Sequence, residues 1–99
     1  MKFTVAHDHP SLPGHFPGAP IVPGVVLLER VLQAIEQVSG APTAPLRLPR
    51  VKFLRPLLPG ETAEVEVEAL APARDGARRW QFRVLRGDAL LATGEVAAP

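Results

Sequence analysis

Two side chains capable of acid–base chemistry lie fourteen residues apart in the run LPGHFPGAPIVPGVVLLE, residues 12–29. The imidazole of His15 can accept or deliver a proton at neutral pH without special tuning. Glu29 has apolar neighbours such as Val25 and Leu32, which could desolvate its carboxyl group and favour the protonated, proton-donating form. The sequence therefore offers a general acid–base pair.

Gly24 adds a possible electrophilic group to this pair. The start of a helix exposes backbone N–H groups at the positive end of the helix dipole, and these can polarise a carbonyl or stabilise an enolate. A glycine at this point lets a ligand approach the backbone closely. Nucleophilic catalysis is poorly supported, because cysteine is absent and Ser11 has no accompanying base-and-orienter pattern.

The elements around these residues can be read from periodicity. Five prolines and three glycines between Pro10 and Gly24 predict a stiff loop, which follows a short strand at Lys2–Ala6. Val25–Val38 has helical periodicity, and its apolar residues cover about half of the circumference, which indicates burial against a curved sheet. The apolar face expected from this pattern consists of Val25, Leu27, Leu28, Val31, Leu32, Ala34, Ile35 and Val38.

The second half of the chain reads as antiparallel β-structure. A strand is expected over Leu46–Leu57, broken by Pro49 and ended by Pro56, and turns are expected at Leu58–Glu61, Asp75-Gly76 and Gly87-Asp88. Alternating residues predict further strands at Thr62–Leu70, Arg79–Val84 and Ala89–Val96, with glutamates of the first facing arginines of the second. One long helix and this sheet predict an α+β domain in which the sheet wraps around the helix.

Composition narrows the function classes. The 99 residues are expected to form a single domain, residues 1–99, and the formal charge of +1 argues against a broad nucleic-acid footprint. The absence of cysteine excludes disulfides and cysteine-ligated metal sites, and His7 and His9 are interpreted as a polar turn or strand end, so no metal is expected. No segment reads as a signal peptide or a membrane span, so a cytoplasmic location is expected.

Two stretches together resemble a known family. GHFPGAPIVPGVVLLERVLQ is similar to the signature of the β-hydroxyacyl-acyl carrier protein dehydratases, and VKFLRPLLPGE resembles their strand-and-turn element, with Glu61 where aspartate is common. The resemblance extends from His9 to about Val96. It implies the hotdog fold, an antiparallel sheet wrapped around one long central helix, and a homodimer with active sites at the subunit interface.

The resemblance also implies roles for single residues. His15 of one subunit would remove the Cα proton of a 3-hydroxyacyl thioester, and Glu29 of the other would assist departure of the β-hydroxyl as water, giving the trans-2-enoyl thioester. The Gly24 amide would bind the thioester carbonyl, and Gln33 would support Glu29 through a hydrogen bond. Further substrate-binding residues implied by the motif are Phe16, Gly18 and Pro23.

The implied partner is an acyl carrier protein whose phosphopantetheine arm carries the substrate, with no other cofactor. Arg50, Lys52 and Arg55 are candidates for holding this acidic partner. The lead-in DHPSLPGHFPG is more similar to small dehydratases of aryl-polyene or polyketide-like pathways than to the enzyme of fatty acid biosynthesis. Two alternatives remain open: a hotdog acyl thioesterase, and a non-catalytic hotdog protein that binds an acyl carrier.

Overall fold

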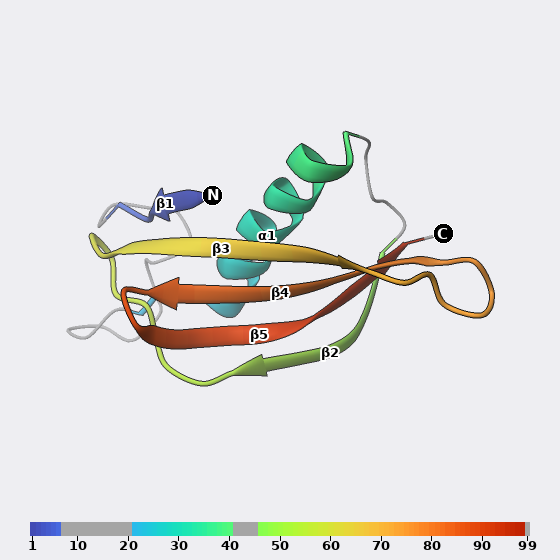
Figure 1. The fold of residues 1–99 in the computed structure, drawn as a ribbon. Helices are drawn as coiled ribbons and strands as arrows, with labels where there is room; N and C mark the ends of the chain where they lie inside the picture. The colour runs from blue at the N-terminus through green and yellow to red at the C-terminus, as the bar shows by residue number, and fades with distance from the viewer. Residues whose placement is uncertain (7–20, 41–45, 99) are drawn as a thin grey trace.

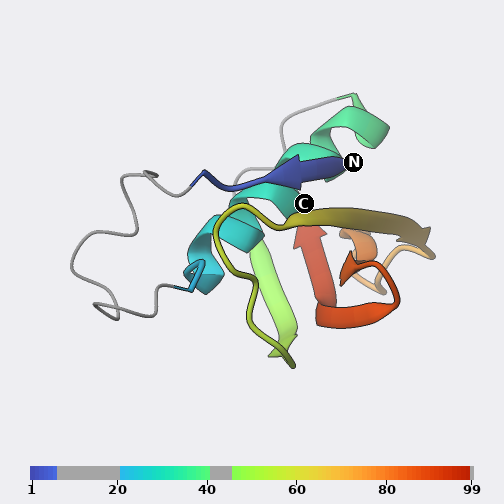
Figure 2. The same ribbon diagram turned by 90° about the vertical axis from the view of Figure 1, so that its left-hand side faces the viewer.

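The computed structural model describes residues 1–6, 21–40 and 46–98. The described elements are β1 (Lys2–Thr4), α1 (Gly24–Ser39), β2 (Arg47–Phe53), β3 (Thr62–Leu70), β4 (Arg78–Arg86) and β5 (Ala89–Ala98). The strands form one antiparallel sheet in the order β1-β3-β4-β5-β2 (Figure 1). The helix lies on one face of this sheet, and no other described element covers the opposite face (Figure 2). The predicted α+β architecture is confirmed.

The helix extends one residue further at each end than the sequence predicted, and Gly40 terminates it. Gly40 adopts the left-handed region at φ 73°, and its N–H donates to the Glu36 carbonyl. The buried face consists of Val26, Leu27, Val31, Ala34 and Ile35. The prediction that Val25 and Val38 belong to this face is wrong, since they are 60% and 66% exposed. Val25 lies one turn before the exposed Glu29, and Val38 belongs to the last turn of α1, which extends beyond the sheet (Figure 1).

The core forms where α1 packs on the inward residues of the sheet. Trp80, Phe82 and Val84 of β4 are all buried, as their alternation predicted. The alternation in β3 is buried only in its first half, at Ala63 and Val65, because β3 and β4 continue past the helix toward their connecting turn (Figure 1). The inward side chains and the helix form one continuous hydrophobic cluster.

The predicted hairpin between β3 and β4 is present. Gly76 has φ 85°, and Asp75 Oδ1 accepts from the Ala77 N–H, which fixes the turn. The register places Glu66 opposite Arg83, and these two side chains form an ion pair. Arg79 instead pairs with Glu95 on β5, so the predicted glutamate–arginine facing holds at one rung and not along the whole hairpin.

Strand β2 is an edge strand and ends at Phe53, four residues before the predicted end at Leu57. A register irregularity between Arg47 and Arg50 accommodates Pro49, which cannot donate a ladder hydrogen bond. After Phe53 the chain turns inward: the Leu54 and Arg55 N–H groups both donate to the Leu91 carbonyl, and Leu57 is fully buried. Within the described part of the chain, no helix is long and apolar enough to cross a membrane.

Candidate active site at the N-terminus of the helix

An open cleft of about 470 Å³ lies at the N-terminal end of α1. Three segments meet there: the residues just before the helix, its first turn, and the end of β2 with the residues that follow. The lining consists of Ile21, Val22, Gly24, Leu27, Phe53, Leu54, Arg55 and Pro56. Its size is within the range of roughly 300–1,000 Å³ typical of small-molecule sites, and its wall is largely aliphatic and aromatic.

Backbone hydrogen bonds hold the walls of the cleft in place. The Val22 N–H donates to the Leu57 carbonyl at 2.8 Å, which joins the entry of the helix to the segment after β2. Arg86 Nη1 donates to the Pro56 carbonyl at 3.2 Å and contacts Glu61 Oε1 at 3.0 Å. The Leu58 N–H and Arg86 together hold the pKa of Glu61 below its usual value, with the backbone bond the larger cause. These contacts fix the cleft wall to the start of β3 and the end of β4.

The start of the helix lies at the cleft, since Gly24 lines it, and its first N–H groups have no partner within the helix. Pro23 occupies the N-cap position with extended angles and provides no side-chain cap, and the first turn contains no acidic residue. The helix begins at Gly24, so the Gly24 N–H is the first donor at the positive end of the helix dipole, and the Val26 N–H donates to the Pro23 carbonyl at 3.0 Å. Such a donor suits a carbonyl oxygen that gains negative charge during a reaction.

Phe53 closes one side of this helix start. An ideal Cβ built on Gly24 would lie 2.8 Å from Phe53 Cζ and 3.1 and 3.2 Å from its two Cε atoms. The ring tip therefore occupies the space next to the Gly24 backbone, and any larger residue at position 24 would displace it. Sequence reasoning did not single out Phe53, although its position in VKFLRP, at the end of an edge strand and before a proline, marked the segment.

Some of the predicted site residues lie at the cleft, and others lie on a different face of the helix. Gly24 lines the cleft, and Pro23 directly precedes it. Glu29 and Gln33 are exposed on another face of the helix and do not line the cleft. The predicted desolvation of Glu29 is wrong within this chain, because Glu29 and its neighbour Val25 are both exposed.

Gln33 has a side-chain contact that the sequence did not indicate. Its Oε1 accepts a hydrogen bond from Arg30 Nη1 at 3.3 Å, and the Arg30 guanidinium lies 5.7 Å from the centroid of the Phe3 ring. The contact uses the amide oxygen, so the amide NH₂ group is the end that can donate to a carboxylate such as Glu29. The predicted residues His15, Phe16 and Gly18 lie outside the described residues.

The three predicted carrier-binding residues lie at two places. Arg55 lines the cleft. Arg50 and Lys52 lie on β2, opposite Glu95 and Thr93 of β5, on the sheet face directed away from the helix. Glu95 is already hydrogen-bonded to Arg79, and that bond, with a smaller contribution from Arg50, lowers the pKa of Glu95.

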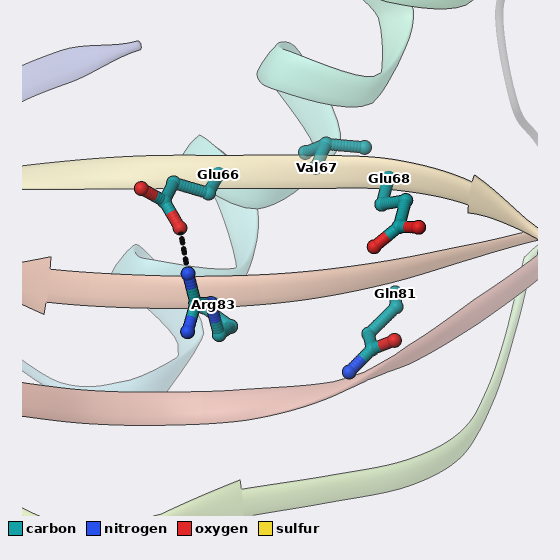
Figure 3. Close-up of a pocket in the computed structure, with 5 residues that line it drawn as sticks. All are labelled: Glu66, Val67, Glu68, Gln81 and Arg83. Carbon is teal, nitrogen blue, oxygen red and sulfur yellow. Dashed lines mark hydrogen bonds and ion pairs between the residues drawn. The ribbon is translucent and has the colours of Figure 1, made fainter.

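A second cleft, of about 380 Å³, lies on that outer face between β3 and β4 (Figure 3). Glu66, Val67, Glu68, Gln81 and Arg83 line it. Its Glu66 and Arg83 are joined by an ion pair, and Glu68 lies beside Gln81 (Figure 3). Among the described residues, no group of three or more His, Cys, Asp or Glu side chains is arranged to bind a metal.

The sequence profile of the ApeI-like family, described as ApeI dehydratase, matches residues 1–95. The chain belongs to this family. A 3-hydroxyacyl-[acyl-carrier-protein] dehydratase FabZ from Symbiobacterium thermophilum is 39% identical over 72% of the chain and 55% of its own length. The FabZ from Desulforamulus reducens is 30% identical over 94% of the chain and 70% of its own length.

A bifunctional enzyme LpxC/FabZ from Porphyromonas gingivalis is 30% identical over 96% of the chain. The chain spans 22% of that relative and 55% of the Symbiobacterium one, so it corresponds to part of each. The family membership agrees with the resemblance recognised in the sequence.

Solved structures place the family member in a known fold. The dehydratase heterocomplex ApeI:P from Xenorhabdus doucetiae aligns over 99% of the present protein and 84% of the matched ApeI:P chain, with a TM-score of 0.65 and 19% identity. A probable thioesterase from Bartonella henselae aligns over 98% of the chain and 84% of that chain, with a TM-score of 0.70 and 15% identity. The fold is the hotdog fold that the resemblance predicted. Since a dehydratase and a probable thioesterase share this fold, the fold alone does not choose between the two activities.

Proposed function

We propose that the protein is a 3-hydroxyacyl-[acyl carrier protein] dehydratase. It eliminates water from a 3-hydroxyacyl thioester and leaves the trans-2-enoyl thioester. The observation that carries this proposal is the helix start at Gly24, whose N-cap Pro23 has no capping side chain and which lies at an apolar cleft in a member of a dehydratase family. An acyl thioester needs both features, an apolar wall for its chain and a hydrogen-bond donor for its carbonyl oxygen.

The proposed reaction uses three groups of the chain. The Gly24 N–H donates to the thioester carbonyl and stabilises the negative charge that forms on its oxygen as the Cα–H bond breaks. His15, nine residues before Gly24, takes that proton. Glu29 donates a proton to the β-hydroxyl, the Cβ–O bond breaks, and water leaves while the Cα–Cβ double bond forms.

We further propose that each site is built from two copies of the chain. Glu29 follows Gly24 by five residues, so at about 100° per residue the two lie about 140° apart around the helix. One chain's Glu29 is thus directed away from its own cleft, and a site that contains both groups requires a second chain. Two exposed surfaces support such an interface: the β2 edge with Leu48, and the helix face around Val25.

The partner chain is proposed to be a second copy, which makes a homodimer. The ApeI of Xenorhabdus doucetiae occurs in a dehydratase heterocomplex, ApeI:P, so a chain of different sequence is the competing partner. Sedimentation of the isolated protein separates the two, because a homodimer forms from this chain alone and a heterocomplex leaves it monomeric.

The substrate is proposed to arrive on the phosphopantetheine arm of an acyl carrier protein, without any other cofactor, in the cytoplasm. Arg55 is the cationic residue nearest to the reaction among the three candidates, since it lines the cleft. Arg50 and Lys52 lie on the outer face of the same edge strand, where Arg50 lies opposite the Glu95 carboxylate, which attracts its charge. Arg55 is therefore expected to contribute most to carrier binding, and the pathway is expected to be of the aryl-polyene or polyketide type.

The direct test uses 3-hydroxyacyl carrier-protein thioesters with straight-chain and aryl acyl groups, analysed by mass. With the wild type, the thioester should lose the mass of one water. His15→Ala and Glu29→Gln should each lower turnover by about 10²- to 10⁴-fold. Glu36→Gln, an exposed glutamate on the same helix, is the matched control and should leave turnover unchanged. Release of free acid would identify a thioesterase, and carrier binding without turnover would identify a non-catalytic protein.

Mixing the two inactive variants tests the shared site. In a dimer, His15→Ala and Glu29→Gln chains pair randomly, and each mixed dimer contains one site with both groups intact. About half of the dimers are mixed and half of their sites are complete, so the mixture should recover about a quarter of wild-type activity. A mixture that stays inactive would mean that both groups act within one chain.

A further inference from the structure

We propose that Phe53 selects the acyl group: its ring forms the cleft wall beside the Gly24 N–H, and its bulk limits which acyl chains fit. This inference rests on the proposed dehydratase function and adds a specificity-determining residue to it. It starts from the contact between the ring tip and the Gly24 backbone, where the nearest ring atom lies 2.8 Å from the Cβ position.

The exposure of Phe53 sets it apart from the other described aromatic residues. Phe3, Trp80 and Phe82 are at most 8% exposed and belong to the hydrophobic core, whereas Phe53 is 51% exposed and lies outside it. Burial of an aromatic side chain is a large favourable term in folding, and the fold uses only about half of it at this position. The ring thus remains available for contact with another molecule.

The position of the ring determines which molecule it meets. A thioester whose carbonyl oxygen binds the Gly24 N–H has its Cα and Cβ within a few ångströms of that nitrogen, and the tip of the Phe53 ring lies next to the same backbone. The neighbouring wall residues Val22, Leu27 and Leu54 are aliphatic and continue the apolar surface away from the helix start. The acyl chain, rather than the polar arm of the carrier, is the part of the substrate that matches this wall.

The backbone around Phe53 is anchored to the sheet, so its ring can limit the size of the acyl chain although the ring lies outside the hydrophobic core. Phe53 is the last residue of the edge strand β2, it pairs only with Ala92 of β5, and the chain leaves the sheet immediately after it. The backbone is nevertheless anchored, because the next two N–H groups both donate to the Leu91 carbonyl. A smaller side chain at position 53 should therefore enlarge the cleft without moving its wall.

The test compares Phe53→Ala and Phe53→Leu with the wild type. Leu58→Ala is the matched control, because Leu58 is 44% exposed, close in sequence and absent from the cleft lining. The measurement is kcat/KM for a short straight-chain and a bulky aryl 3-hydroxyacyl thioester on the same carrier protein. Phe53→Ala should shift the ratio toward the bulky substrate by at least about 10-fold, Phe53→Leu by less, and Leu58→Ala not at all.

A second variant pair tests the contact itself. Gly24→Ala should push the ring into the cleft and raise KM for the bulky substrate more than for the short one. Adding Phe53→Ala should reverse that difference, because it removes the atoms that the new Cβ strikes. Thermal melts of all variants check that the fold is retained.

The outcomes separate the two proposals. A wild type without turnover would overturn both the dehydratase function and this inference. Wild-type turnover with an unchanged substrate ratio in Phe53→Ala would overturn the inference alone. A uniform loss for both substrates would mean that the ring contacts the carrier arm or the second subunit, and this result would also overturn acyl selection by Phe53.

Discussion

The helix-side cleft and the outer cleft have similar sizes, about 470 and 380 Å³, and opposite chemistry. The outer cleft is made by cross-strand neighbours, and two of its three charged residues, Glu66 and Arg83, form an ion pair (Figure 3). The helix-side cleft joins three separate segments and combines an apolar wall with the backbone donor of Gly24. Side chains that lie opposite each other on neighbouring strands can pair with one another. The start of a helix instead has backbone N–H groups without intrahelical partners, and such a group can bind a ligand.

The largest effect on stability is expected at Gly94 of β5, which lies between β2 and β4. A Cβ at Gly94 would lie 2.3 Å from the Arg50 carbonyl and 2.8 Å from two atoms of the Phe82 ring. Because a backbone atom cannot move aside as a side-chain end can, Gly94→Ala should separate β2 from β5 and cost about 4 kcal/mol or more in the free energy of unfolding. Urea denaturation measures this cost.

Gly24→Ala provides the comparison for that substitution. Its new Cβ would strike only the tip of the Phe53 ring, so the loss in stability should be about 1 kcal/mol. Equal losses for the two glycine variants would contradict the assignment of the Gly94 effect to a backbone clash.

The support beneath the helix-side cleft can be tested with two adjacent leucines. Leu57 is fully buried and Leu58 is 44% exposed. Leu57→Ala should cost about 3 kcal/mol through lost burial and the cavity that it leaves, and Leu58→Ala should change stability by less than about 0.5 kcal/mol. The reverse order in denaturation experiments would show that the segment after β2 does not pack as described.

Acid should weaken the outer face selectively through Glu95. Its carboxylate is 2.5 Å from Arg79 Nη2, and the resulting hydrogen bond lowers the pKa of Glu95 below the ordinary glutamate value of 4.5. The folded state therefore binds this proton less readily than the unfolded state, so the stabilisation is present above that value and is lost as the pH falls through the folded pKa. Glu95→Gln should lower stability at neutral pH and reduce its acid dependence.

Thermal melts from neutral pH downward test this sign. The curves of wild type and Glu95→Gln should converge as the pH falls below 4.5. Divergence on acidification would contradict the assignment to Glu95.

The smallest effect is expected from the outer cleft itself. Glu66 and Arg83 are about half exposed, so their ion pair is screened by water and salt. Glu66→Gln should change stability by about 0.5 kcal/mol, an effect that added salt should abolish, and should leave turnover unchanged. A large loss of turnover would instead give the outer cleft a part in the function.

Periodicity predicted the helix, the strands and the hairpin turn at Asp75-Gly76, because each depends on nearby residues. It assigned Val38 to the core and Leu57 to a strand, since it cannot tell where a helix extends beyond its sheet or where an edge strand stops pairing. The role of Phe53 was missed for a related reason: its neighbour Gly24 is distant in sequence, and their contact exists only once β2 is placed beside the helix.

The candidate site was predicted unevenly. Gly24 and Arg55 line the cleft as parts of motifs that the sequence singled out. The cooperation of Glu29 with the cleft stays a prediction, because the 3.6-residue turn directs Glu29 away from Gly24 within one chain.

Pro49 restricts the register in which another strand could pair with the free edge of β2. The pairing of β2 with β5 is continuous from Arg50 to Phe53 and irregular before it, and residue 49 has no N–H to offer to any neighbouring strand. A strand of a second chain that paired with β2 would have a short regular stretch available, from Arg50 to Phe53, bounded at its N-terminal end by Pro49. The proline would then set the offset between two copies, and with it the distance from Glu29 of one to the cleft of the other.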